Sequence, residues 1–159
     1  IGDRGLAADG SAPRGFFGGE VAAPVPTALA RARVLHAAIA AGHVRACHDL
    51  SEGGLLVALA EMCLGGRLGA TIDLRRVPAD GIDRTARAFA ESSSRWLLEV
   101  SPEAVEAITE CLAGHPWADL GEVGGDTLTV TDGPERLVTL PVATLRAAFA
   151  RDPSQQDHP

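Results

Sequence analysis

The chain has 159 residues, with 14 lysines and arginines against 21 aspartates and glutamates, so its formal net charge at pH 7 is −7. That length is enough for one domain with a hydrophobic core, and the acidic balance argues against a nucleic-acid partner held by neutralisation of its phosphates. No apolar run is long enough to span a membrane and no basic-then-apolar signal segment opens the chain, so we expect no membrane partner.

Three regions are predicted along the chain. Residues 1–26 are rich in glycine, proline and alanine with little periodicity, which predicts a loop-like N-terminal segment. Residues 27–150 carry regular apolar patterns and form the predicted domain, and residues 151–159 are polar, which predicts a disordered tail. Because the chain starts at Ile1 and its one methionine is Met62, we expect it to be a piece of a longer polypeptide.

The first regular element is a helix predicted over residues 27–41 and ended by Gly42. Its apolar positions recur at helical spacing and form one stripe: Ala28, Ala32, Leu35 and Ile39. A short strand is predicted over residues 44–48 and places Asp49 at its carboxyl end.

The bend after this strand combines acids, a hydroxyl and glycines. The helix that follows, over residues 55–64, is apolar except at Glu61, which predicts that it is buried and that its start is held rigidly. Ser51 is its predicted N-cap. A helix start has unpaired N–H groups and partial positive charge, and glycines let phosphate oxygens approach it closely. Asp49 and Glu52 would repel a bare phosphate, so such a site requires a divalent cation between acids and ligand.

The same bend has a second, purely structural interpretation. Asp49 and Ser51 would cap the helix, and Gly53 and Gly54 would only allow a tight turn, because all four are ordinary turn residues. The residue types alone leave both interpretations open.

The remaining elements alternate between strand and helix patterns. The predicted strands cover residues 70–74, 95–100, 120–123, 127–131 and 136–140, and the predicted helices cover 84–90, 101–113 and 142–150. The helix that starts at Ser101 has a capping hydroxyl, a proline at its first position and an acid in its first turn. Its predicted inner face is Val105, Ile108 and Leu112. Interleaved strands and helices predict an α/β (α+β) domain with a mixed sheet and helices packed on it.

A second polar turn precedes the predicted strand at 95–100. Glu91, Ser92 and Ser93 can face either a phosphate or solvent. Arg95 can clamp a phosphate through two hydrogen bonds or pair with a neighbouring acid. Both interpretations stay open on the residue types alone.

Zinc and hydrolase chemistry are not supported around Cys47, His48 and Asp49. A tetrahedral zinc site needs a further pair of ligands, and the other cysteines and histidines supply none at suitable spacing. Ser51, His48 and Asp49 are too close in sequence for a triad and no Gly-x-Ser-x-Gly is present, so no catalytic residue is predicted and His48 is interpreted as structural. The three irregularly spaced cysteines favour reduced thiols and a cytoplasmic protein.

Residues 42–74 read GHVRACHDLSEGGLLVALAEMCLGGRLGATIDL. The His-Asp-x-Ser-Glu-Gly-Gly-Leu run ahead of an Ala- and Leu-rich helix resembles the C-terminal domain of the phosphoribosylformylglycinamidine synthase family, within the AIR-synthase-like superfamily. The segment from Phe89 to Arg95 resembles that family's Glu-Ser-x-x-Arg turn ahead of a hydrophobic strand. Residues 17–20, Phe-Gly-Gly-Glu, resemble its Leu-Gly-Gly-Ser and depart from it at Phe17 and Glu20.

The resemblance implies an AIR-synthase C-terminal-domain fold within an ATP-dependent carbon–nitrogen ligase of purine biosynthesis. That family converts formylglycinamide ribonucleotide to formylglycinamidine ribonucleotide with ATP and with ammonia from a glutaminase domain or subunit. Mg²⁺ and ATP or ADP are the implied cofactors. The implied partners are that glutaminase and the missing N-terminal domains, without which the fragment is expected to be inactive.

By the same likeness Asp49 is a magnesium ligand, and Glu91, Ser92 and Ser93 contact a phosphate-bearing ligand. With the residues of the first bend and the arginine added, the predicted ligand- or phosphate-binding residues are Ser51, Gly53, Gly54, Glu91, Ser92, Ser93 and Arg95. In some family members the corresponding site holds a structural nucleotide, so auxiliary ADP is one candidate ligand. Two other classes stay open: a domain of another ATP-dependent enzyme of the superfamily, and a non-catalytic interaction domain that has kept the fold.

Overall fold

The fold was obtained as a computed structural model, and the structure describes residues 27–78 and 82–150. The elements in chain order are α1 (Ala28–Ala40), β1 (Ala46–Asp49), α2 (Gly54–Gly66), β2 (Ala70–Asp73), the 3-10 turn η1 (Leu74–Arg76), α3 (Arg84–Phe89), β3 (Trp96–Glu99), the 3-10 turn η2 (Pro102–Ala104), α4 (Val105–Cys111), β4 (Gly121–Val123), β5 (Thr127–Asp132), β6 (Glu135–Pro141) and α5 (Val142–Phe149). Among the described residues, no helix has the length and apolarity needed to cross a membrane.

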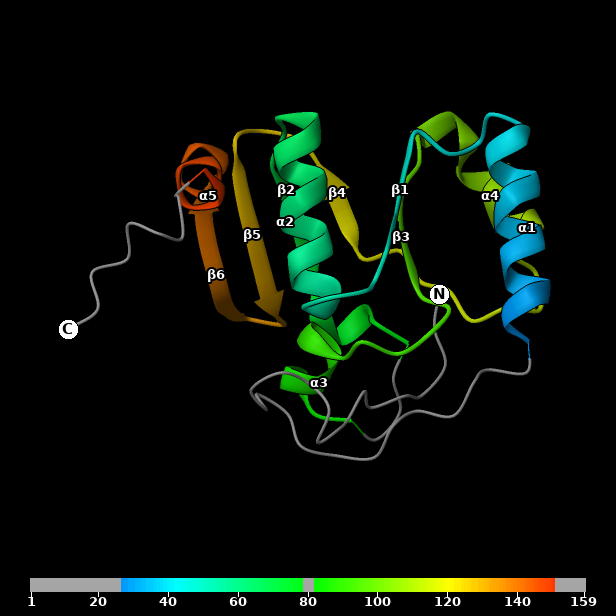
Figure 1. The fold of residues 1–159 in the computed structure, drawn as a ribbon, viewed down its shortest axis with the longest axis horizontal. Coiled ribbons are helices and arrows are strands. Elements are labelled where there is room, and N and C mark those ends of the chain that lie inside the picture. Colours follow the sequence, from blue (N-terminus) through cyan, green and yellow to red (C-terminus); the bar gives the residue numbers. More distant parts are fainter. Residues whose placement is uncertain (1–26, 79–81, 151–159) are drawn as a thin grey trace.

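The strands form two separate sheets. A four-stranded sheet has the order β4-β2-β5-β6, in which β2 and β5 are parallel and the other neighbours are antiparallel. β1 and β3 form an antiparallel two-stranded ribbon. Figure 1 shows α2 lying over the larger sheet, with the ribbon beside it and α1 and α4 beyond the ribbon. The predicted mixed sheet with helices packed on it is confirmed, and the ribbon is an addition to it.

The main core lies between α2 and the four-stranded sheet. Leu55 and Leu59 of α2 pack with Ile72 of β2 and Val130 of β5 in one buried cluster. Fully burying side chains of this size stabilises the fold by roughly 1.5–3 kcal/mol each. A smaller cluster joins α1 to α4 through Ala38, Ile108 and Leu112. The larger cluster reaches Leu50, directly after β1, and therefore holds the end of the ribbon against α2.

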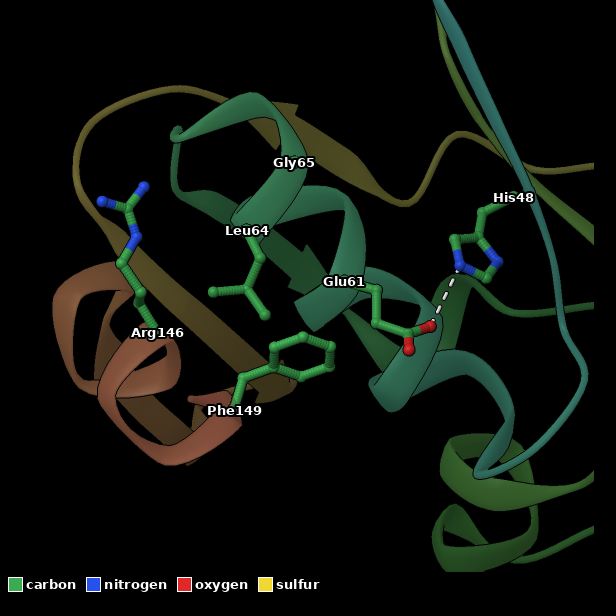
Figure 2. A pocket seen from close by; sticks show the side chains of 6 residues that line it. All are labelled: His48, Glu61, Leu64, Gly65, Arg146 and Phe149. Atoms are coloured by element: carbon green, nitrogen blue, oxygen red, sulfur yellow. Dashed lines mark ion pairs between the residues drawn. The ribbon is translucent and has the colours of Figure 1, made fainter. Parts of the chain in front are cut away.

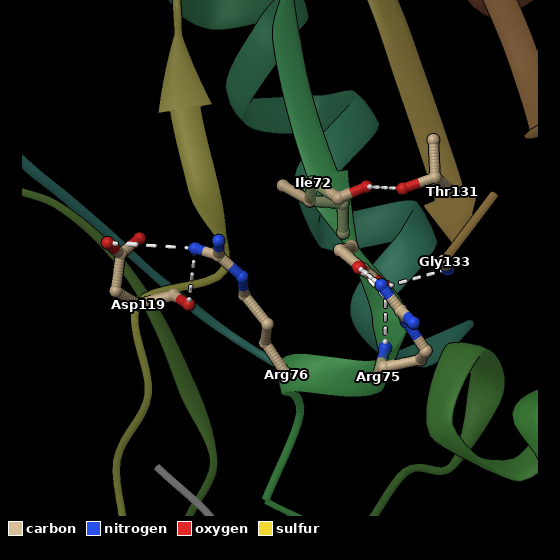
Figure 3. A network of polar contacts seen from close by, with 7 residues as sticks. Ile72, Arg75, Arg76, Asp119, Thr131 and Gly133 are labelled. Atoms are coloured by element: carbon tan, nitrogen blue, oxygen red, sulfur yellow. Dashed lines mark hydrogen bonds and ion pairs between the residues drawn. The ribbon is translucent and has the colours of Figure 1, made fainter.

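The carboxylate of Asp73 fastens the end of β2 to the turn between β5 and β6. It accepts hydrogen bonds from the backbone amides of Arg75 (3.0 Å) and Gly133 (3.2 Å), and it forms an ion pair with the Arg75 guanidinium (2.6 Å). Close by, Thr131 donates its hydroxyl to the carbonyl of Ile72 (3.2 Å), as Figure 3 shows. These bonds fix the register of the two parallel strands at one end of the sheet.

Two predicted helix faces are partly wrong. In α1 the buried residues are Arg31, Leu35 and Ala38, whereas Ile39 is 44% exposed, because the side of the helix that packs on α4 is the one that carries Ala38. The helix predicted over residues 101–113 is a 3-10 turn followed by a shorter α4, which contacts α1 through Ile108 and Leu112. Val105, predicted to face inward, is 50% exposed, and the predicted Ser101 side-chain cap is not formed.

The expectation of a buried second helix is largely confirmed. Among residues 55–64 only Val57 is exposed (38%), and the others are buried or half-buried. The predicted N-cap is wrong, because the cap position is Gly53 with φ +76° and Ser51 lies outside the helix. The predicted strands all form within about two residues of their expected bounds.

Several predictions lie outside the described residues. These are the loop-like segment 1–26 with its Phe17-Gly18-Gly19-Glu20 run, part of the connection around residues 79–81, and the tail 151–159. The proposed division into these regions stays a prediction.

Candidate functional site

The ribbon brings the two polar bends to the same end of the fold. β1 and β3 pair antiparallel with Asp49 opposite Trp96, so the bend that leaves β1 starts where the bend that enters β3 finishes. The backbone N–H of Leu50 donates to the carbonyl of Arg95 (3.0 Å) and continues this pairing beyond the strands. Two motifs separated in the sequence are therefore spatial neighbours.

A second connection joins the bends where α2 begins. The amide N–H of Gly53 donates to the Glu91 carboxylate (2.8 Å). Gly54 has φ +64°, and a Cβ added there would lie 2.6 Å from the backbone carbonyl carbon of Phe89, at the end of α3. A side chain at this position would push the start of α2 away from the second bend, so glycine is required for the two bends to meet.

A cavity of about 390 Å³ lies between the two bends. It is lined by Asp49, Leu50, Ser51, Glu91, Ser92, Ser93, Ser94, Arg95 and Trp96. Gly53 and Gly54, which the sequence also predicted, are not among the lining residues. Leu50, Ser94 and Trp96 were missed by the sequence reasoning, although their position directly beside the two motifs was an available signal. The structure thus assembles most of the predicted residues around one space.

The polar groups in this cavity differ in their availability. The Asp49 side chain is 67% exposed and its Oδ1 lies 3.8 Å from Nδ1 of His48, so its oxygens are accessible to a cation. Ser92 is only 3% exposed. The amide N–H of Gly54 donates to the Ser51 carbonyl (3.2 Å), so this N–H and that of Gly53 already have acceptors within the protein.

Arg95 supplies the positive charge of the cavity wall. Its guanidinium donates to the carbonyl of Ala90 (2.9 Å), which closes the second bend on itself. Burial lowers the pKa of the Arg95 guanidinium, but an arginine stays charged at neutral pH. Within residues 27–78 and 82–150, none of the ion pairs involves Arg95, so the alternative in which it pairs with a neighbouring acid is not seen there.

His48 faces away from this cavity and connects β1 to α2. Its Nε2 lies 3.0 Å from the Glu61 carboxylate and its Nδ1 lies 2.6 Å from the carbonyl oxygen of Asp49. Figure 2 shows this pair at the edge of a second cavity, of about 540 Å³, between α2 and α5. The interpretation of His48 as a structural residue agrees with these contacts.

Cys47 and two possible metal ligands, His48 and Asp49, come directly before the bend in the sequence. Among the described residues, no group of three or more His, Cys, Asp or Glu side chains is placed to hold a metal ion. Within residues 27–78 and 82–150, Asp49 is therefore not part of a cluster of three side chains so placed. Desolvation, with a smaller contribution from the charge of Asp49, raises the pKa of the Cys47 thiol, which keeps this cysteine protonated and poorly nucleophilic.

Comparison with known proteins gives one consistent answer. Residues 4–133 match the family described as AIR synthase related protein, C-terminal domain. The chain is 44% identical over 124 residues to the phosphoribosylformylglycinamidine synthase subunit PurL of Rhodospirillum rubrum, covering 74% of this chain and 16% of that protein. It is 41% identical over 119 residues to the same subunit of Thermobifida fusca, covering 74% of this chain and 15% of that protein.

Solved structures agree with the sequence relatives. PurLQS from Thermotoga maritima superposes with a TM-score of 0.71 at 25% identity, over 79% of this chain and 23% of that one. T. maritima PurL complexed with ATP superposes with a TM-score of 0.65 at 27% identity, over 72% of this chain and 21% of that one. The chain spans only about a sixth of the length of the R. rubrum and T. fusca subunits.

Proposed function

The chain belongs to the family of the AIR synthase related protein, C-terminal domain, and on that premise we propose that it is the C-terminal domain of a phosphoribosylformylglycinamidine synthase. In this role it contributes one wall of a nucleotide-phosphate site. The complete enzyme converts formylglycinamide ribonucleotide to formylglycinamidine ribonucleotide in purine biosynthesis, as an ATP-dependent carbon–nitrogen ligase. The identity to the R. rubrum subunit, 44% over 124 residues, supports this assignment.

The observation that carries the proposal is the cavity between the two bends. Its walls combine an accessible carboxylate, several hydroxyls and a guanidinium: Asp49, Ser51, Ser92, Ser93 and Arg95. Hydroxyls and a guanidinium are donors for phosphate oxygens, and a carboxylate beside them is a ligand for a cation that neutralises the same phosphates. Gly53, Gly54 and Glu91 shape this wall through their contacts with one another and with Phe89.

The donor set fits Mg²⁺ bound together with a nucleotide. Magnesium keeps several waters and takes one or two protein carboxylates plus substrate phosphates. Asp49 offers one accessible carboxylate, and the described residues hold no cluster that could bind a metal ion without a ligand. Asp49 would hold the ion, which would neutralise charge on the phosphates, while Arg95 and the serines orient the phosphate oxygens.

The rest of the reaction belongs to parts of the polypeptide outside this chain. We propose that further domains of the same polypeptide supply the remaining parts of the reaction site, that the phosphate-binding wall described here binds Mg-ADP on its own, and that a glutaminase domain or subunit supplies ammonia. The 159-residue chain alone is then inactive as a synthase. The proposal places the protein in the cytoplasm, with no nucleic-acid or membrane partner.

Calorimetric titration of the purified chain with ADP in the presence of Mg²⁺ tests the proposal. Saturable binding of Mg-ADP, with no formylglycinamidine ribonucleotide formed from ATP, ammonia and formylglycinamide ribonucleotide, is the expected result. Absence of saturable binding at millimolar Mg-ADP would identify the chain as an interaction domain that has kept the fold. Product formation by the chain alone would contradict the proposal that further domains are needed for the reaction.

A further inference from the structure

The second bend approaches the start of α2 through an acid. The Glu91 carboxylate accepts the N–H of Gly53 at 2.8 Å, across 38 residues of sequence. Gly53 is the N-cap residue of α2 and has no side chain with which to cap the helix. In an ordinary capping box, a glutamate in the first turn accepts the N-cap N–H. Here an acceptor from a different segment takes that place.

This hydrogen bond and a second one, at the other end of the cavity, join its two walls. At the ribbon end the Leu50 N–H donates to the Arg95 carbonyl (3.0 Å), and at the helix end Gly53 is bound to Glu91. The wall that carries Asp49 and the wall that carries Arg95 are thus joined at both ends. Loss of the Glu91 bond would leave the helix end of the first bend held by the close approach of Gly54 to Phe89 and by the core cluster that contains Leu55 and Ala88.

Electrostatics also argues against Glu91 as a direct phosphate contact. Its carboxylate and that of Asp49 line the same cavity, and a phosphate placed beside either would be repelled. Next to the first N–H groups of α2, in contrast, the negative charge of Glu91 is stabilised by the partial positive charge of the helix start.

Resting on the proposed nucleotide site, we propose that Glu91 is a positioning residue for that site. Its carboxylate oxygen holds the Gly53 amide, and this bond keeps Asp49 and Ser51 at the correct distance from Ser92 and Arg95. The function requires a hydrogen-bond acceptor at this position and does not require negative charge. Glutamine can supply that acceptor, and alanine cannot.

Three variants of the 159-residue chain separate positioning from direct binding. Glu91→Gln keeps an acceptor and removes the charge, Glu91→Ala removes both, and Glu106→Ala removes an exposed acid from α4 as the matched control. The first measurement is hydrogen exchange of the Gly53 amide by NMR. We expect exchange about tenfold faster in Glu91→Ala, the effect of one lost hydrogen bond, and rates within about twofold of wild type in Glu91→Gln and Glu106→Ala.

The second measurement is the dissociation constant for Mg-ADP. Positioning predicts about tenfold weaker binding in Glu91→Ala and recovery to within about twofold of wild type in Glu91→Gln. Equal losses in both variants would make Glu91 a charged ligand of the cation, and tighter binding in both would make it only a source of repulsion. Either result overturns the proposal, as does wild-type affinity in Glu91→Ala. If Glu91→Ala does not fold, the Mg-ADP affinity of Glu91→Gln is the test. Binding within about twofold of wild type supports the positioning role, and a larger loss contradicts it.

The two measurements also distinguish failure of this inference from failure of the proposed function. If the wild-type chain does not bind Mg-ADP, both the proposed nucleotide site and the positioning role of Glu91 are contradicted. This holds even if the Gly53 amide exchanges faster in Glu91→Ala. If the chain binds Mg-ADP and the Gly53 amide exchanges at the wild-type rate in Glu91→Ala, the site stands and the role of Glu91 is overturned.

Discussion

Asp73, the last residue of β2, accepts a hydrogen bond from the backbone amide of Gly133, 60 residues later in the chain (3.2 Å). The same carboxylate binds the side chain and the backbone amide of Arg75. Together these contacts lower the pKa of Asp73 well below its ordinary value, with the Arg75 side-chain hydrogen bonds as the largest cause. The Asp73 carboxylate thereby links the end of β2 to η1 and to the turn between β5 and β6.

Stability should therefore depend on the ionisation of Asp73. A carboxyl group with a depressed pKa stabilises the fold fully above its unfolded-state pKa of about 3.9, and this contribution is lost as the pH falls further. We predict that Asp73→Asn lowers the urea midpoint at pH 7, and that the gap to wild type narrows between about pH 5 and pH 2. Urea unfolding at a series of pH values measures this, and a gap that stays constant across the range would contradict it.

Gly54 is predicted to be intolerant of any side chain. Alanine there would place Cβ 2.6 Å from the Phe89 backbone in a residue with φ +64°. We expect Gly54→Ala to lower the free energy of unfolding by at least about 2 kcal/mol, through strain and forced separation of α2 from α3. Chemical denaturation gives the value directly.

Gly65 provides the matched control in the same helix. It lies in the last turn of α2, and a Cβ added there meets nothing within 4 Å. Gly65→Ala should therefore raise the free energy of unfolding by about 0.5–1 kcal/mol, because alanine loses less backbone entropy in a helix. Equal effects of the two substitutions would show that the Gly54 contact does not matter.

Arg95 is expected to act through its planar guanidinium and not through charge alone. Arg95→Lys keeps the positive charge but loses the fork that can bind two phosphate oxygens, so Mg-ADP binding should weaken by about tenfold or more. Arg84→Lys, which alters an arginine paired with Glu135 outside the cavity (2.6 Å), should leave the affinity unchanged. Calorimetry compares the two variants, and equal affinities would remove Arg95 from the site.

Local patterns in the sequence were sufficient to predict most of the fold. The short segments 127–131 and 136–140 between turn residues predicted β5 and β6, and the Ala- and Leu-rich run predicted α2, because both signals depend on neighbours a few residues away. The exposure of Val57 could not be predicted, because an apolar helix has the same residue pattern whether or not the tertiary fold covers each of its residues.

The candidate site shows the same contrast between local signals, which the sequence contains, and long-range contacts, which it does not. Most of its members, but not Leu50, Ser94 and Trp96, were predicted from two motifs and a family resemblance. Nothing in the residue types indicated that Gly53 would bind Glu91 or that Leu50 would bind Arg95. Those contacts depend on the antiparallel pairing of β1 with β3, which is a long-range feature. The same limitation explains the wrong N-cap, because Ser51 has suitable chemistry for a cap while the backbone begins the helix after Gly53.

We propose that Asp49 holds a divalent cation that bridges to a nucleotide phosphate. The measurement is the Mg²⁺ dependence of ADP affinity in the wild-type chain and in Asp49→Asn. Asp119→Asn is the control, because Asp119 is an exposed acid that does not line the cavity. We predict that Mg²⁺ strengthens ADP binding by about tenfold or more in wild type and in the control, and has little effect in Asp49→Asn. An ADP affinity that is independent of Mg²⁺ in wild type, or equally dependent on it in Asp49→Asn, would contradict the claim.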